Sequence, residues 1–164
     1  MSVLTILEVS QKQAFIFKSK KLKDNVDNSC LIAWIMSPKF FEKTINDESI
    51  FSEKDNLVYS GGGHVVLEFE DKDKSYSFIK IITSEIYKKH TDILVFATSI
   101  EYKDTMTPGE NLKELTKKLE DKKAKRKAAF HQGSFGVEKI NSETLKPVMK
   151  QNDEKDDCFN NYMH

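Results

Sequence analysis

The chain has 164 residues, of which 38% are hydrophobic and 32% are charged, and this balance predicts one globular domain with a well-solvated surface. Its 26 basic and 26 acidic residues cancel to a formal net charge of zero, which excludes a global basic field for nucleic acid but not a local basic patch. Because Arg126 is the one arginine in the sequence, bidentate arginine contacts to phosphate or guanine are excluded as the main binding device.

The cysteines and the hydropathy pattern bear on location. Cys30 and Cys158 are far apart and form no CxxC pair, so neither a zinc site nor a disulfide framework is expected, and the predicted location is the reducing cytoplasm. No apolar run approaches the ~18 residues that a membrane span requires, so we expect no membrane association.

The N-terminal part of the chain predicts a strand followed by helices. Residues 2–9 are mostly β-branched or apolar, which is typical of a buried strand. Ser10 and Gln13 match the S-x-x-Q capping box, so a helix is predicted to start there. Asp27 can cap a second helix, and the Ser-Pro pair at 37–38 starts a third, with proline at the tolerated first helical position.

The middle of the chain predicts a β-hairpin. A polar loop over 46–56 leads into a strand at 57–60, and the alternating residues 64–70 form the returning strand. Between the two strands, the three glycines at 61–63 form the turn.

The next pattern predicts a helix, a strand and a last helix. In residues 74–90 the apolar positions recur at the spacing of one buried helix face, and residues 92–102 form an apolar strand. Thr107 and Glu110 enclose a capping box with proline at the first helical position, so a helix follows. The predicted buried face of the helix over residues 74–90 consists of Phe78, Ile81, Ile82 and Ile86.

The periodicity is lost from Gln132 onward, where Gly133 and Gly136 break the helical pattern. We therefore expect a palm domain over residues 1–131 and a loosely packed tail over 132–164. The element order predicts an α/β (α+β) sandwich with a ferredoxin-like palm fold, in which an antiparallel sheet with a central hairpin carries helices packed on one face.

Two segments carry a family resemblance. The first runs through Leu7-Glu8-Val9-Ser10, Gln13, Phe15-Ile16, Lys20-Lys21-Leu22-Lys23-Asp24 and residues 29–32, and the second is Tyr59-Ser60-Gly61-Gly62-Gly63-His64. Together they resemble the palm domains in the large polymerase-cyclase subunit of type III CRISPR effector complexes. The resemblance covers about residues 2–130 in element order.

The resemblance implies a function as well as a fold. In that family two adjacent palms cradle ATP, and one palm carries a Gly-Gly-Asp-Asp hairpin that holds Mg²⁺ and makes cyclic oligoadenylates, which switch on antiviral effectors. Here Gly63 and His64 replace the two hairpin carboxylates, and Glu8 replaces the aspartate of the first strand. The resemblance thus implies a degenerate palm that binds ATP and pairs with a catalytic palm or with itself, for cyclic (oligo)nucleotide signalling in antiviral defence.

The chemistry of the replaced residues leads to the same expectation. Two-metal nucleotidyl transfer needs carboxylates that converge on ions about 3.5–4 Å apart. Glu8 could supply one, but the next hairpin acid, Glu68, lies about 13 Å along the strand from His64. A neutral histidine prefers softer metals than Mg²⁺. We therefore expect no metal site and no catalytic residue in this chain alone.

The predicted nucleotide-binding residues are Glu8, Ser10, Lys20, Lys21, Ser60, Gly61, Gly62, Gly63 and His64. Each feature also has a structural explanation: the glycines can form an ordinary turn, Glu8 can favour the start of the following helix, and the lysines can form a solvated face. The basic run at 117–127 could bind RNA or could simply be solvated.

Two other functions therefore stay open at this point. One is a nucleotidyl cyclase or transferase that acts as a homodimer, using Glu8 and acids of a second protomer. The other is a purely architectural subunit of a ribonucleoprotein complex, with RNA among its partners and no nucleotide bound.

Overall fold

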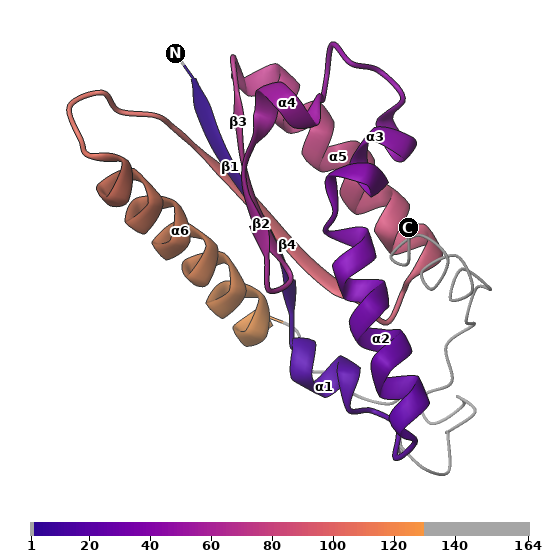
Figure 1. Ribbon diagram of the computed structural model, residues 1–164. Helices are drawn as coiled ribbons and strands as arrows, with labels where there is room; N and C mark the ends of the chain where they lie inside the picture. Colours follow the sequence, from indigo (N-terminus) through magenta and orange to yellow (C-terminus); the bar gives the residue numbers. More distant parts are fainter. Residues whose placement is uncertain (1, 130–164) are drawn as a thin grey trace.

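The computed structural model describes residues 2–129, and the predicted tail at 132–164 lies outside the described residues. The elements are β1 (Val3–Ser10), α1 (Lys12–Ile16), α2 (Leu22–Ile35), α3 (Pro38–Ile45), α4 (Glu53–Asn56), β2 (Leu57–Gly61), β3 (His64–Phe69), α5 (Lys72–Lys89), β4 (Leu94–Glu101) and α6 (Pro108–Ala129) (Figure 1). Within the described part of the chain, no helix has the length and apolar character of a membrane span.

The sheet topology confirms the predicted ferredoxin-like α/β fold. β1 pairs antiparallel with β3 and with β4, and β2 pairs antiparallel with β3, which gives the strand order β2-β3-β1-β4. The hairpin therefore contributes one inner strand, β3, and one edge strand, β2. Because β1 is also an inner strand, its residues 3–7 are buried without the alternation of a half-exposed strand.

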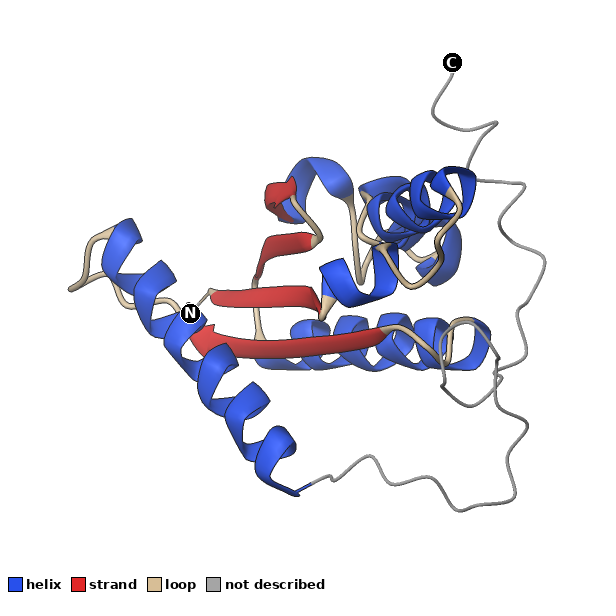
Figure 2. Ribbon diagram, turned by 90° about the horizontal axis from the view of Figure 1, so that it is seen from below, coloured by secondary structure: helices blue, strands red, loops and turns tan. Residues whose placement is uncertain are grey.

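The prediction that the helices pack on one face of the sheet is wrong. α2, α3 and α5 cover one face, and α6 covers the opposite face over β4 and β1 (Figure 1). Figure 2 shows α5 running along the strands and α6 crossing them obliquely. The reason lies in β1: Leu7 and Val9 face the first helical layer, whereas Leu4 and Ile6 face α6, so both sides of the strand need an apolar cover.

The larger core is built around phenylalanine rings. The Phe78 ring on α5 lies 5.2 Å, centroid to centroid, from each of the rings of Phe41, Phe51 and Phe69. All four side chains are almost completely buried. Of the predicted apolar face of α5, Ile82 and Ile86 are also buried, as expected.

Ile81 departs from that prediction, because it is only half-buried. It lies at the edge of the buried face of α5 and lines a pocket between α5 and α3. One turn of α5 is therefore less completely covered than the periodicity suggested.

The predicted start of α6 is confirmed in detail. The Thr107 hydroxyl accepts a hydrogen bond from the Glu110 backbone N–H at 3.3 Å, and the Glu110 carboxylate accepts one from the Thr107 N–H at 2.8 Å. α3 also starts as predicted, since the Ser37 hydroxyl accepts from the backbone N–H of Phe40. These caps satisfy N–H groups that have no partner inside their own helices.

Two other predicted caps are wrong. Ser10 ends β1 instead of capping a helix, and α1 begins after Gln11, which adopts a left-handed backbone with φ 54°. Asp27 lies inside α2, which starts at Leu22. The predicted polar loop at 46–56 also contains the short helix α4.

Two lysines of α6 reach the edge strand β4. Lys118 donates a hydrogen bond to the carbonyl oxygen of Ser99 at 2.8 Å, and Lys122 donates one to the carbonyl oxygen of Ala97 at 2.6 Å. The long lysine side chains thus pack along the sheet and satisfy backbone acceptors of an outer strand.

Candidate functional site at the hairpin turn

The turn between β2 and β3 consists of two glycines with left-handed backbones. Gly62 has φ 60° and Gly63 has φ 76°, while Gly61 already pairs with His64 across the hairpin. Positive φ at both central residues is typical of a two-residue loop whose twist matches that of the strands. The predicted three-glycine turn is therefore a two-residue turn in which Gly61 belongs to β2.

Gly63 is also required by close packing inside the protein. A Cβ atom at this position would lie 2.6 Å from Cδ of Lys12 and 3.2 Å from Cγ2 of Ile32. At Gly62, by contrast, a Cβ atom would have nothing nearer than the His64 ring at 3.7 Å. Gly63 thus lets α1 and α2 approach the turn, and Gly62 is the glycine that faces solvent.

The structure brings together the three positions that the family resemblance singles out. Glu8 lies opposite His64 in the register of β1 and β3, and the Val9 N–H donates to the Gly63 carbonyl oxygen at 2.9 Å. Glu68 lies opposite Leu4 and so belongs to the other half of the β1–β3 ladder.

Two ammonium groups surround the Glu8 carboxylate. Lys123 of α6 donates to Glu8 Oε2 at 2.8 Å, and Lys12 Nζ lies 3.7 Å from Glu8 Oε1 while donating to the Gly62 carbonyl oxygen at 2.6 Å. Partial burial by itself would lower the pKa of Lys123, but its hydrogen bonds to Glu120 and Glu8 outweigh this effect and raise the pKa above its ordinary value. Lys123 therefore stays charged and neutralises Glu8.

These contacts test whether a divalent metal fits the site. In an active palm the first-strand carboxylate and two hairpin carboxylates would supply oxygen ligands, whereas here the donor set is one carboxylate, an imidazole and two ammonium groups. Among residues 2–129 no cluster of three or more His, Cys, Asp or Glu side chains is arranged to hold a metal ion. Mg²⁺ requires oxygen ligands at about 2.0–2.1 Å, so the Glu8 site does not fit this ion.

The remaining hairpin residues have structural contacts. The Tyr59 ring lies 5.2 Å from the His64 ring, and the Tyr59 hydroxyl covers Gly61. The Ser60 hydroxyl donates to the carbonyl oxygen of Met36 at the end of α2, which ties β2 to the helical layer. Ser10 lies at the end of β1, opposite Leu94 of β4.

Lys20 and Lys21 lie away from this group. Both are exposed in the connection between α1 and α2, whereas the turn meets α2 at Ile32. The rise of about 1.5 Å per residue puts Ile32 about 15 Å along the helix from Leu22. The structure thus groups Glu8, Ser60, Gly61, Gly62, Gly63 and His64, and it leaves the two lysines outside.

Sequence reasoning missed the two cations of the site. Lys12 follows Glu8 at the i, i+4 spacing, which was an available signal, although the pair spans a strand end and a helix start. Lys123 gave no local signal, because it is one of several lysines on α6 and only the packing of that helix selects it.

Comparisons with known proteins give matches in structure only. No protein-family model and no curated protein matches the sequence. The solved structure of an apo Csm1–Csm4 cassette matches with a TM-score of 0.61 at 18% identity, over 76% of this chain and 19% of that chain. Csm1 of T. onnurineus matches with a TM-score of 0.56 at 15% identity, over 76% of this chain and 20% of that one.

A Csm1–Csm4 subcomplex of the type III-A CRISPR–Csm interference complex matches with a TM-score of 0.55 at 18% identity, over 83% of this chain and 20% of that chain. This chain therefore has a fold present in Csm1, the palm/cyclase subunit of type III CRISPR complexes, and the predicted resemblance is confirmed at the level of fold. It spans about a fifth of the length of these Csm1 chains.

Proposed function

We propose that this chain is a degenerate palm domain of CRISPR-type antiviral defence, which binds ATP at the hairpin turn and pairs with a catalytic palm or with a second copy of itself. It serves cyclic (oligo)nucleotide signalling as a binding and assembly partner and has no metal-dependent catalysis of its own. The observation that carries the proposal is that Glu8, opposite His64 in the β1–β3 register, is paired with the ammonium groups of Lys12 and Lys123.

The electrostatics of this group favour a nucleotide that binds without a metal ion. A Mg²⁺ ion would have to displace the Lys123 ammonium from Glu8 and would still lack further carboxylates. The same ammonium groups are suitable partners for phosphate oxygens, since lysine binds phosphate as a point charge. Lys12 is the better placed of the two, because it already contacts the solvent-facing turn at Gly62.

The comparisons support this proposal indirectly. Matching structures include Csm1–Csm4 cassettes in complex with one ATP, with AMPPNP, with cA3 and with cA4. The fold shared with these proteins is compatible with nucleotide binding beside the hairpin and with work in a multi-subunit complex.

The melting temperature with and without ATP tests the nucleotide site. A ligand at 100 times its dissociation constant adds about 2.7 kcal/mol, which raises the melting temperature of a domain of this size by about 5–10 °C. We expect this shift with ATP alone and an equal shift when Mg²⁺ is added. A Lys12→Met variant should lose most of it, and the matched control Lys20→Met, outside the hairpin group, should keep it.

The other outcomes separate the alternatives. A shift that needs Mg²⁺ would contradict the metal-free site and support the homodimeric enzyme. No shift, together with intact pairing, would support the architectural subunit. Co-purification that depends on RNA and weakens steeply with salt would point the same way.

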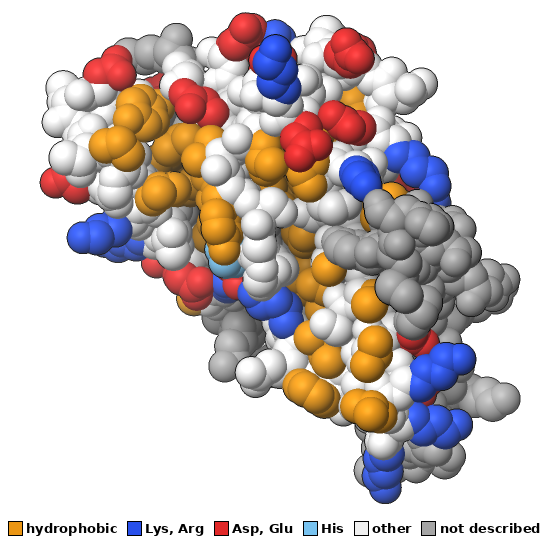
Figure 3. All heavy atoms as spheres, in the orientation of Figure 1, with side chains coloured by type: hydrophobic (Ala, Val, Ile, Leu, Met, Phe, Trp, Pro, Cys, Tyr) orange, Lys and Arg blue, Asp and Glu red, His pale blue; other side chains and the backbone are white. Residues whose placement is uncertain are grey.

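An exposed apolar stripe on α2 supports the proposed pairing. Leu22 is 78% exposed and Val26 is 45% exposed on the outer side of this helix. Figure 3 shows apolar side chains in a stripe along α2. Contiguous exposed apolar surface commonly marks an interaction site, and α2 also contacts the turn through Ile32. A palm docked on this stripe would contact the N-terminal half of α2, about 9–15 Å along the helix from Ile32, where α2 meets the turn.

Charge on this stripe is expected to prevent pairing. In size-exclusion chromatography with light scattering, the Leu22→Lys, Val26→Lys double variant should elute as a monomer and should fail to bind a catalytic palm that the wild type binds. Tyr76→Lys is the matched control, because Tyr76 is 66% exposed on α5 and should tolerate the change. Normal pairing of the double variant would place the interface elsewhere.

A further inference from the structure

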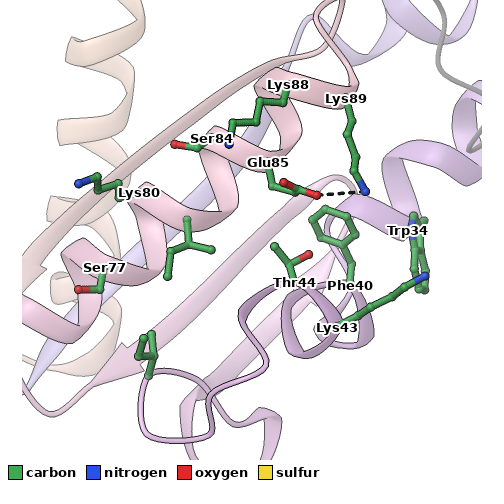
Figure 4. Close-up of a pocket in the computed structure, with 12 residues that line it drawn as sticks. Trp34, Phe40, Lys43, Thr44, Ser77, Lys80, Ser84, Glu85, Lys88 and Lys89 are labelled. Atoms are coloured by element: carbon green, nitrogen blue, oxygen red, sulfur yellow. Dashed lines mark ion pairs between the residues drawn. The ribbon is translucent and has the colours of Figure 1, made fainter.

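A pocket of about 630 Å³ lies between α3 and α5 in the helical layer, and none of the hairpin residues lines it (Figure 4). Its apolar lining comes from Trp34, Phe40, Ile50 and Ile81. Polar groups from α3 and α5 surround these side chains. A volume of this size falls in the range of about 300–1,000 Å³ that is typical of sites for small organic ligands.

On the α5 side, the pocket is lined by two serines and Ile81 together with longer charged side chains. Ser77, Ile81 and Ser84 follow one another at helical spacing beside the buried face of the helix. The two serines are too short to reach across to Phe40 and Thr44 of α3. The half-buried Ile81, which the periodicity assigned to the core, is thus part of the pocket lining.

The charge around the pocket is strongly positive. Lys43, Lys80, Lys88 and Lys89 line it against the single acid Glu85. Lys43 Nζ lies 6.0 Å from the centroid of the Trp34 ring, and Lys89 Nζ lies 3.0 Å from Glu85 Oε1. Figure 4 shows Lys43 and Lys89, which come from facing helices, extending toward the same end of the pocket beside Trp34. An anion at that end would be held from both sides.

A helix C-terminus often carries lysine because the cation offsets the helix dipole, and this accounts for the position of Lys43, Lys88 and Lys89 in the last turns of their helices. The dipole does not account for the four apolar side chains and three hydroxyl groups that line the same cavity. The pocket thus combines a positively charged end with apolar walls, and it therefore suits a small ligand that has an anionic group and an apolar part.

We propose that this pocket binds a nucleoside monophosphate, independently of the hairpin. The phosphate lies between Lys43 and Lys89, and the base packs on the half-buried side chains of Ile50 and Ile81. Trp34 and Phe40, which are 7% and 4% exposed, add only the small exposed part of their rings to this surface. The hydroxyl groups of Thr44 and Ser84 are available to the polar edges of the ligand. The site lies in the helical layer and uses no residue of the hairpin group, so its test is separate from that of the proposed function.

Trp34 provides a direct readout, since it is the one tryptophan in the sequence and lines the pocket. Titration with AMP should change Trp34 emission, excited at the red edge to avoid nucleotide absorption, along a saturable curve. Adenosine alone and inorganic phosphate alone should each bind at least tenfold more weakly than AMP, because each satisfies only half of the pocket.

Variants locate the binding. Lys43→Glu should weaken AMP binding at least tenfold, and Ser84→Phe should abolish it by filling the cavity, with unchanged far-UV circular dichroism in both. Lys39→Glu on the same helix, which does not line the pocket, should bind AMP as the wild type does. The proposal is overturned if AMP gives no saturable change in the wild type, or if the affinity is the same in Lys43→Glu and Lys39→Glu.

Discussion

Replacement of Phe78 by alanine is expected to lower the free energy of unfolding by about 3–5 kcal/mol. Phe78 is fully buried, and its ring contacts three other phenylalanine rings that come from α3, β3 and the segment before α4. The substitution removes the side chain at which these elements meet and leaves a cavity that rigid neighbouring rings cannot fill. Urea unfolding followed by circular dichroism measures the loss of free energy of unfolding. In thermal unfolding, the melting temperature should fall by about 10 °C.

Ile81→Ala is the matched control for this experiment. Ile81 lies on the same helix but is only half-buried at the pocket, so its truncation should cost about 1 kcal/mol. Similar losses for the two variants would mean that the aromatic cluster is not the centre of the core.

Replacement of Gly63 by alanine is expected to destabilise the protein by about 2–4 kcal/mol, for two additive reasons. The backbone at φ 76° is strained for a residue with a Cβ atom, and that atom would lie 2.6 Å from Lys12 Cδ and 3.2 Å from Ile32 Cγ2. Aspartate at this position meets the same side chains, so restoring the hairpin carboxylate of an active palm requires the Lys12 side chain to move and Ile32 to shift.

Gly62→Ala separates the two contributions. Gly62 shares the left-handed backbone at φ 60°, but its nearest neighbour is 3.7 Å from the would-be Cβ atom. This variant should lose only the strain, about 1–2 kcal/mol. Equal losses at Gly62 and Gly63 in urea unfolding would show that close packing at Gly63 contributes nothing.

The parts of the fold with strong local signals were predictable from the sequence. The capping box at Thr107 satisfies its own helix end, and the alternation around the glycines defines the hairpin without help from the rest of the chain. The Ser10 capping box failed because sheet pairing opposite Leu94 extends β1 to that residue, and this contact between distant segments outweighs the local motif.

The candidate site was predictable only in part, for a related reason. Glu8, Gly63 and His64 were found because the resemblance places them at known positions, and the register of β1 and β3 brings them together. The charge state of the site depends on Lys123, which arrives from α6 on the face of the sheet that was expected to be bare. Because the predicted fold had no helix on this face of the sheet, the predicted site lacked the Lys123 ammonium group.

The lysines that bond the carbonyl oxygens of Ala97 and Ser99 have a consequence for aggregation. An outer strand with unpaired backbone groups is a template on which another chain can add a strand, and lysine on such a strand discourages this. Since Lys122 and Lys118 already occupy two acceptors of β4, strand addition to the described sheet is less favourable at this edge. A sheet that can be extended on one side gives a closed pair when two copies meet, whereas two open sides would allow an unlimited fibre.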